Sequence, residues 1–409
     1  MVFWYTNTFL DGSFLSLFHF IHDQGLIGAL REIWGPYILG SKMAWLLIGV
    51  FAAFEILLMR FLPGKRFLGP VTPKGNIPIY KANGVLSFAV TMLTFALLSF
   101  GFNIFSPTII YDHLGPILGA LTLFSLIFCL FLYFKGRFRP SSSDNGYEHN
   151  FIFDYYWGTE LYPRVFGIDI KQLTNCRFGM MSWCLILLSY GAKQHQLYGI
   201  SDSMIVAIAL QFIYVTKFFM WETGYLKSLD IMHDRAGFYI CWGCLVWVPC
   251  IYTSPTMYLV HHPNHLGPYV SAFILGAGTL CILANYMADR QRQRVRVLDG
   301  QCKVWGKEPT IIRADYHTAQ GEEKKSILLA SGYWGVARHF HYVPEILGAF
   351  FWSVPALFVN FMPYFYVVFL VILLVDRAVR DDKRCHGKYK EHWDKYCVKV
   401  PYKIIPFIY

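Results

Sequence analysis

The C-terminal end of the chain combines cationic, acidic and aromatic side chains that could together bind a charged cofactor. Nine lysine and arginine residues fall between positions 377 and 403. At the surface of a bilayer, such a cluster could simply attract anionic headgroups. The interleaved Cys385, Tyr389, Trp393 and Tyr396 indicate a shaped site instead, because headgroup attraction needs no aromatic side chains at fixed spacing.

Asp381 opens this basic segment and could take part in acid–base chemistry. It follows Arg377 by four residues, and nearby arginines normally stabilise the ionised form of a carboxylate. If Asp381 also faces an apolar cavity, it can relay a proton through a tyrosine. The candidate relay residues are Tyr214, Tyr389 and Tyr396.

A second cationic cluster lies earlier in the chain, in the sequence DRQRQRVRVLDG at 289–300. In a helix, Arg292 and Arg296 share one face. Two guanidinium groups one turn apart can bind a phosphate or a diphosphate, although a cluster that stops membrane insertion has the same composition. The sequence has no glycine-rich phosphate-binding motif, so helix ends and cationic loops would have to hold any nucleotide.

Four ionisable residues follow one another closely after an apolar run: Glu222, Asp230, His233 and Asp234. Ionisable groups inside a membrane protein are costly unless they are paired, and they are functional candidates by default. We expect a polar network that lines a cavity, with Lys227 paired to a carboxylate. A metal site is the weaker alternative, because a second histidine at ligand spacing is missing, and no metal is predicted.

Composition assigns the chain to the polytopic membrane proteins. Of its 409 residues, 55% are hydrophobic and only 15% are charged, which is too apolar for a set of soluble domains. We therefore predict an all-α polytopic membrane protein with about nine to ten transmembrane helices. The apolar runs long enough to span a bilayer lie at 43–62, 85–105, 114–134, 178–192, 203–220, 237–253, 268–288, 345–361 and 362–376.

The loops between these runs alternate in lysine and arginine content, which predicts the orientation in the membrane. The basic loops lie at 60–81, 135–177, 217–235 and 289–325, and the loops without lysine or arginine lie at 106–113, 254–266 and 359–363. This pattern places the C-terminus in the cytoplasm. The ten cysteines show no regular spacing, so we expect them to be reduced.

Three long motifs resemble the sterol reductase family, which includes the Δ14-sterol reductases, the lamin B receptor membrane domain and 7-dehydrocholesterol reductase. They are GTELYPR, LLASGYWGVARHFHY and RDDKRCHGKYKEHWDKYCVKVPYKIIP. The first belongs to a segment that gathers aromatic residues around Glu160 and Arg164, as an interfacial aromatic belt with an ion pair would. Further stretches, such as WETGYLKSLDIMHDRAGFY, are most similar to the Δ7-sterol reductases, in their plant-type branch.

The resemblance implies a fold of about ten membrane helices with an NADPH pocket in the C-terminal half, and this chain is expected to lack most of the first helix. We therefore expect a transmembrane bundle over 1–288. We expect residues 289–409 to form an NADPH-binding half, with a re-entrant or interfacial helix near SILLASGYWGVARHF, two spans and the basic tail. The positions that match family NADPH contacts are Arg292, Arg296, Leu329, Trp334, His341, Tyr342, Arg377, Asp381, Cys385, Lys388, Tyr389 and Tyr396.

The activity implied by the resemblance is NADPH-dependent reduction of a sterol ring double bond, with the 7,8 bond of a 5,7-diene as the first expectation. Such a bond does not accept hydride until it is protonated. A proton added at carbon 8 leaves a cation at carbon 7 that is conjugated with the 5,6 double bond, and hydride then reaches carbon 7. We expect Tyr214 and Asp381 to form the acid system, with Glu222 as an alternative carboxylate.

Several alternatives remain open. The enzyme could reduce a Δ14 or a side-chain Δ24 double bond, or the protein could bind sterols without catalysis. The ending RHFHY…VPYKIIP is also similar to membrane methyltransferases of the isoprenylcysteine type. We expect a sterol substrate, membrane lipid around the chain and no nucleic acid. The membrane would be the endoplasmic reticulum in a eukaryote, or an inner or host-derived membrane in a bacterium.

Overall fold

The computed structural model describes residues 1–317, 321 and 323–409. Helices dominate these residues, which confirms the prediction of an all-α polytopic membrane protein. Within the described residues, seven helical stretches are long and apolar enough to cross a membrane. They are Lys42–Phe61, Gly84–Gly101, Leu114–Phe138, Asp202–Met220, Phe238–Leu259, Gly267–Val297 and Met362–Tyr389.

Two of the predicted spans, 178–192 and 345–361, lie outside these seven stretches. One forms α8 (Met180–Tyr198), in which the polar side chains of Ser189 and Gln194 are buried. The other forms α16 (Tyr342–Ser353), which has only 12 residues and is followed by Pro355 in a short 3₁₀ turn. Because each helical residue rises about 1.5 Å, α16 is too short to cross a bilayer by itself.

The described residues form two compact units. The first comprises Met1–Gly267 and Pro355–Pro363, and the second comprises Pro268–Val354 and Tyr364–Tyr409.

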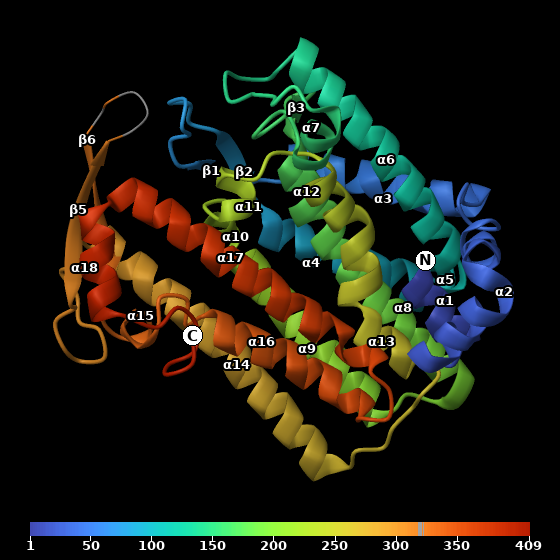
Figure 1. Cartoon of the computed structure of the whole chain (residues 1–409). Coiled ribbons are helices and arrows are strands. Elements are labelled where there is room, and N and C mark those ends of the chain that lie inside the picture. The colour runs from blue at the N-terminus through green and yellow to red at the C-terminus, as the bar shows by residue number, and fades with distance from the viewer. Residues whose placement is uncertain (318–320, 322) are drawn as a thin grey trace. The chain divides into compact units, whose positions relative to one another are not determined.

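The first unit is a helical bundle (Figure 1). Serine residues begin several of its helices. Ser13, Ser41 and Ser201 each accept a hydrogen bond from the backbone N–H three residues later, which satisfies a donor that the helix itself leaves free. The α-helices are α1 (Val2–Phe9), α2 (Phe14–Trp34), α3 (Lys42–Phe61), α4 (Gly84–Ala96), α5 (Ile109–Asp112), α6 (Leu114–Phe138), α7 (Phe151–Trp157), α8, α9 (Asp202–Met220), α10 (Glu222–Tyr225), α11 (Leu229–Met232), α12 (Phe238–Trp242) and α13 (Ser254–Leu259). The π-helical segments are η1 (Leu97–Gly101), η2 (Gln172–Gly179) and η3 (Gly243–Tyr252).

Two short antiparallel hairpins accompany these helices. Strand β1 (Lys65–Leu68) pairs with β2 (Ile79–Ala82) in the connection between α3 and α4. Strand β3 (Arg164–Val165) pairs with β4 (Ile168–Asp169) shortly before η2. Gly167 has a φ of +80° in the second turn, a conformation that glycine adopts without steric cost.

A buried ion pair holds several elements of the first unit together. Arg177 Nη1 lies 2.6 Å from Glu222 Oε1, and both side chains are almost fully excluded from solvent. Glu222 also accepts hydrogen bonds from the Gly84 N–H at 2.8 Å and from Gln172 Nε2 at 3.2 Å. Arg177 donates a further bond to Asn83 Oδ1 at 2.9 Å. The pair therefore fixes η2 and α10 to the start of α4.

In the second unit, long helices pack beside a β hairpin (Figure 1). Helix α16 lies between α14 and α17, whereas α18 packs on strand β5. The elements are α14 (Pro268–Val297), β5 (Ile311–His317), β6 (Glu323–Leu329), α15 (Tyr333–Val336), α16, α17 (Phe365–Tyr389) and α18 (Glu391–Lys399). The connection from α16 to α17 contains the 3₁₀ turns η4 (Val354–Ala356) and η5 (Met362–Tyr364), and its residues Pro355–Pro363 belong to the first unit. Helix α14 continues past the predicted span to Val297, so Arg292 and Arg296 lie on this helix rather than in the loop expected at 289–325.

The segment SILLASGYWGVARHF differs from its expected re-entrant or interfacial helix. Its first residues complete β6, and only Tyr333–Val336 forms a helical turn. Ile327 and Leu329 pack in one buried cluster, whereas Leu328 packs in another on the opposite face of the strand. A strand covered on both faces gives a continuous apolar run, which periodicity cannot distinguish from a buried helix.

Candidate functional site

Arg292 and Arg296 lie on one face of α14, next to α15 and β6 of the same unit. The Arg292 guanidinium lies 3.9 Å from the centroid of the Trp334 ring, and its Nη2 lies 3.1 Å from Asp289 Oδ1. Arg296 Nε donates a hydrogen bond to the backbone oxygen of Ile327 at 3.2 Å. Because a guanidinium has five N–H donors, these contacts orient both cations and leave donors for an anionic group.

Trp334 connects several of the predicted cofactor-binding residues. Its Nε1 donates to the backbone oxygen of Ala288 at 2.7 Å, and its own backbone oxygen accepts from the Tyr396 hydroxyl at 3.3 Å. The His341 ring lies 4.9 Å from the Trp334 ring and 4.3 Å from the Tyr342 ring, measured between centroids. Leu329 belongs to the same buried cluster as Trp334. These side chains therefore occupy one place in the second unit.

Asp381 is held by an ion pair within α17. Arg384 Nε donates to its Oδ1 at 3.0 Å, and the Cys385 sulfur lies 3.9 Å from its Oδ2. Arg380 pairs with Asp376, one turn earlier, at 2.8 Å. The arginine that neutralises Asp381 therefore comes from the following turn of the same helix.

The aromatic side chains of the C-terminal segment fold against the β5–β6 hairpin. Tyr389 and Tyr396 belong to a buried cluster with residues of both strands, and the Tyr389 hydroxyl donates to Ser326 Oγ at 3.3 Å. Lys388 Nζ lies 4.0 Å from the centroid of the Tyr316 ring. Among the described residues, neither tyrosine hydroxyl is bonded to Asp381, and each is committed to another partner.

His339 is a residue of this site that the sequence interpretation missed. Its ring is buried, and its Nε2 lies 3.9 Å from Asp381 Oδ2 without a hydrogen bond to any described residue. Burial lowers the pKa of His339 from 6.5 to about 4, with a further decrease from Arg292 and Arg338 and a partial opposing effect of Asp381 and Asp382. The imidazole beside Asp381 is therefore neutral at pH 7.

The only signal for His339 in the sequence was its place in the motif RHFHY, where two histidines are two residues apart. The structure places both rings beside Tyr342, and the His339 ring also approaches Asp381. The His339 ring stacks on Tyr342, with 5.2 Å between the ring centroids and an interplanar angle of 8°, and its backbone N–H donates to the Lys403 oxygen at 2.7 Å. This contact anchors the end of the chain beside Asp381.

The three predicted catalytic residues are divided between the units. Tyr214, in α9, and Glu222, in α10, belong to the first unit, whereas Asp381 belongs to the second. The Tyr214 ring lies 5.7 Å from the Trp183 ring, and Lys217 Nζ lies 5.3 Å from the Tyr214 centroid. The carboxylate of Glu222 is engaged in the buried ion pair and accepts two further hydrogen bonds, which favours a structural role. The pairing of Tyr214 with Asp381 stays a prediction.

The ionisable segment after Glu222 is organised by Lys171. Lys171 Nζ donates to three backbone oxygens of residues 230–234 at 2.7–3.0 Å, and burial lowers the pKa of Lys171 to about 8. Lys227 Nζ lies 5.4 Å from the centroid of the Phe67 ring, and its ion pair with a carboxylate stays a prediction. No group of side chains suited to hold a metal occurs among the described residues.

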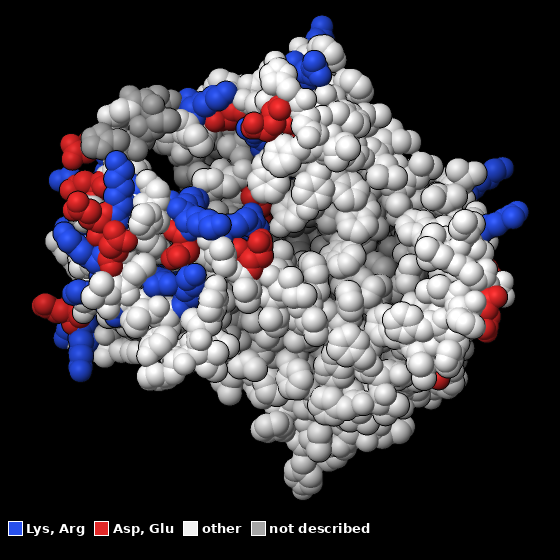
Figure 2. Space-filling model, in the orientation of Figure 1, with Lys and Arg blue, Asp and Glu red and all other residues white. Residues whose placement is uncertain are grey.

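Charge is concentrated at one end of the second unit. In Figure 2, blue and red side chains gather over β5, β6, α18 and the adjoining end of α17, whereas the surface of the rest of α14 and α17 is largely uncharged. The membrane-spanning part of each long helix therefore passes directly into the charged segment that carries the predicted cofactor residues.

Comparisons with known proteins agree with this arrangement. Residues 7–409 match the Ergosterol biosynthesis ERG4/ERG24 family. The chain is 56% identical to the 7-dehydrocholesterol reductase of Arabidopsis thaliana, over 99% of this chain and 93% of the relative. It is 36% identical to the 7-dehydrocholesterol reductase of Xenopus laevis, over 93% of this chain and 83% of the relative. It is also 36% identical to the Delta(14)-sterol reductase of Methylotuvimicrobium alcaliphilum, over 93% of this chain and 87% of the relative.

A match over nearly the whole chain favours a reductase over the isoprenylcysteine-type methyltransferase and over a sterol-binding protein without activity. The apolar helices agree with an integral membrane protein. The chain belongs to the ERG4/ERG24 family and is a membrane enzyme of the sterol reductases.

Proposed function

We propose that the protein uses NADPH to reduce the 7,8 double bond of sterol 5,7-dienes of the 7-dehydrocholesterol type. The observation that carries this proposal is the 56% identity to the Arabidopsis thaliana 7-dehydrocholesterol reductase. Reduction of a Δ14 bond is the second candidate, because a Delta(14)-sterol reductase is 36% identical. The difference in identity favours the Δ7 reaction.

The residues of the second unit fit NADPH by their chemistry. Arg292, Arg296 and Lys388 offer cations for its phosphate groups. The aromatic rings of Trp334 and Tyr396 suit planar rings. The Trp334 ring lies 3.9 Å from the Arg292 guanidinium, and the Tyr396 hydroxyl is bonded to the Trp334 backbone. When bound, NADPH supplies the hydride for carbon 7. The proposed binding set also contains Leu329, His341, Tyr342, Arg377, Asp381, Cys385 and Tyr389.

Asp381 and Tyr214 form the acid system in this proposal. The Tyr214 hydroxyl gives its proton to carbon 8 of the sterol, and the tyrosinate is reprotonated from solvent through a relay that includes Asp381. Arg384 stabilises the carboxylate form of Asp381 between proton transfers. His339, which is neutral and close to Asp381, positions this carboxyl group. Glu222 acts through the packing of the first unit, because its oxygens are already engaged.

The proposed topology has the C-terminus in the cytoplasm and the NADPH-binding residues in 289–409. The basic loops support this orientation. Cytoplasmic placement would give the charged end of the second unit access to a soluble cofactor, while the sterol reaches the enzyme from the membrane, such as the endoplasmic reticulum of a eukaryote.

Replacement of Asp381 by asparagine should remove turnover. Membranes that contain the parent protein, NADPH and 7-dehydrocholesterol should lose the conjugated-diene absorbance and form cholesterol. The D381N variant should be at least about 100-fold slower, because its amide cannot pass on a proton, while it still binds NADPH. Asp376→Asn is the matched control, since Asp376 is an exposed carboxylate one turn earlier in α17, and it should remain active. Near-normal turnover of D381N would reject the role of Asp381.

Removal of either α14 arginine should raise the NADPH concentration that the enzyme requires. Loss of a hydrogen bond to a charged group costs about 1.5–3 kcal/mol, so Arg292→Ala and Arg296→Ala should each raise the KM for NADPH by about 10-fold or more. The control is Arg294→Ala, because Arg294 is an exposed residue between them on the helix. Equal KM values for all three variants and the parent would assign Arg292 and Arg296 to membrane topology alone.

The buried His339 should make stability depend on pH. Because the pKa of His339 is lower in the folded state than in the unfolded state, the neutral ring adds to the free energy of unfolding. This stabilisation is complete above pH 6.5 and is lost as the pH falls from 6.5 towards 4. At pH 5 the folded state has lost about 2 kcal/mol of this stabilisation. Thermal unfolding of the purified protein, followed by tryptophan fluorescence at pH 7 and pH 5, should therefore show a smaller loss of stability for His339→Gln than for the parent. The control variant is His386→Gln, because His386 is exposed, and it should lose as much stability as the parent. If His339→Gln also loses as much stability between pH 7 and pH 5 as the parent, the prediction is contradicted.

A further inference from the structure

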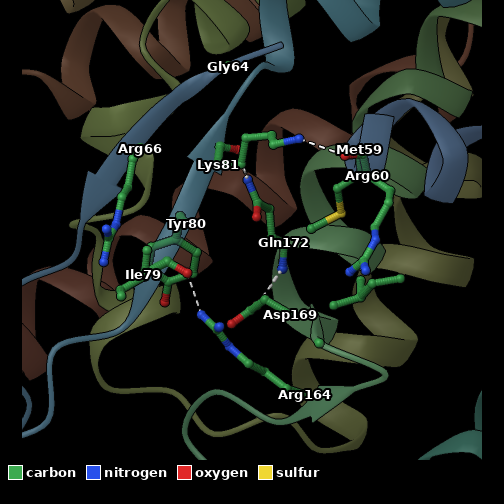
Figure 3. A pocket seen from close by; sticks show the side chains of 12 residues that line it. Met59, Arg60, Gly64, Arg66, Ile79, Tyr80, Lys81, Arg164, Asp169 and Gln172 are labelled. Atoms are coloured by element: carbon green, nitrogen blue, oxygen red, sulfur yellow. Dashed lines mark hydrogen bonds between the residues drawn. The ribbon is translucent and has the colours of Figure 1, made fainter. Parts of the chain in front are cut away.

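A cavity of about 430 Å³ lies in the first unit, and no residue of the proposed cofactor or acid site lines it. Figure 3 shows that its walls come from three separate parts of the sequence: the end of α3, the β1–β2 hairpin and the β3–β4 hairpin with the start of η2. A cavity of this size is in the range of small-molecule sites. Its polar lining residues are Arg60, Arg66, Tyr80, Lys81, Arg164, Asp169 and Gln172.

The cations around this cavity are only partly used by the protein. Arg60 and Arg66 form no ion pair or side-chain hydrogen bond with the described residues, and in Figure 3 they enclose the cavity from opposite sides. Arg164 donates one bond to the backbone oxygen of Ile79, and its buried Nε has no partner. Lys81 donates to two backbone oxygens at the end of α3, at 2.7 and 3.1 Å. Three guanidinium groups therefore retain donors for an anion.

The wall also contains a buried carboxyl group, which a simple cluster of surface cations would not include. Asp169 is 3% exposed. Its Oδ1 accepts the Gln172 N–H at 3.0 Å, whereas its Oδ2 is buried without a hydrogen-bond partner. Burial raises the pKa of Asp169. A buried polar oxygen without a partner is rare in a folded protein, and a ligand hydroxyl group would satisfy it.

The cavity lies at the ends of two membrane-spanning helices. Arg60 is in the last turn of α3, and the β1–β2 hairpin connects α3 to α4. Both helices are among the candidate spans. A lipid headgroup at the bilayer surface and a soluble metabolite could therefore both reach this position.

We propose that this cavity binds the phosphate ester of a polyol, with the phosphate on Arg60, Arg66 and Arg164 and a hydroxyl group on Asp169. Guanidinium groups are the preferred partners of phosphate oxygens, and the hydroxyl group gives the unpartnered Asp169 oxygen a donor. Cations that only orient the chain in the membrane would require neither the cavity nor the buried carboxyl group. The phosphate ester comes either from an anionic phospholipid headgroup or from a soluble sugar or inositol phosphate.

The test measures binding of tritiated inositol 1,4-bisphosphate to the full-length protein in phosphatidylcholine nanodiscs. Saturable binding is expected, and Arg66→Gln should weaken it by about 10-fold or more, since one charged hydrogen-bond partner is lost. Lys65→Gln is the matched control, because Lys65 is the neighbouring residue of β1, does not line the cavity and projects to the other side of the strand. Equal binding by both variants, or no saturable binding by the parent, would overturn the proposal.

Two further competition experiments identify the ligand. Nanodiscs that also contain phosphatidylinositol 4-phosphate should block the soluble probe if the natural source is a lipid headgroup, and they should leave its binding unchanged if the source is soluble. Inorganic phosphate should compete at least 10-fold less well than the inositol ester, and Asp169→Asn, which keeps the side-chain volume, should reduce this preference. Equal competition by inorganic phosphate would reject the polyol.

The cavity is also distinguishable from the NADPH site. Arg66→Gln should leave the KM for NADPH unchanged while it weakens binding of the inositol ester. A raised KM in this variant would instead assign the arginines of the cavity to the cofactor and overturn the inference. Failure of inositol-ester binding would leave the proposed reductase activity unaffected.

Discussion

The cost of placing charge in a helical membrane bundle governs this structure. An ionisable side chain at membrane depth is expensive unless a partner or a hydrogen-bond network compensates it. The Arg177–Glu222 pair meets this requirement and at the same time fixes η2, α10 and the start of α4. Lys171 meets it with three backbone oxygens. The buried charges of the first unit therefore act as connections between segments that apolar packing alone would not hold in register.

In the second unit, charged side chains gather at the ends of the long helices. Its long helices α14 and α17 are apolar over most of their length and become charged at the ends where the β5–β6 hairpin and α18 pack. Trp334, Tyr389 and Tyr396 fill the space between these elements, so that Arg292, Asp381 and their neighbours are fixed by packing rather than by loops. Such rigidity is what a cofactor that must meet its substrate at a defined atom requires.

The sequence predicted much of this architecture because hydropathy and charge are local properties. The apolar run at 268–288 predicted most of α14, whereas its charged continuation to Val297, with Arg292 and Arg296, was expected as a loop because most of its residues are charged or polar. Strand β6 was not predicted, because both of its faces are covered and its apolar run has no period. His339 could not be distinguished from His341 by type or spacing, since burial decides its protonation. The cavity around Asp169 was equally hidden, because its residues come from distant parts of the chain.

A competition between sterols would show which double bond the enzyme reduces. Membranes that contain this protein and NADPH would receive equal amounts of a 5,7-diene sterol, a Δ14 sterol and a side-chain Δ24 sterol, and the products would be separated by gas chromatography and mass spectrometry. We expect the 5,7-diene to be consumed first and to yield the Δ5 sterol. Preferred consumption of the Δ14 or Δ24 sterol, with the 5,7-diene unchanged, would contradict this expectation.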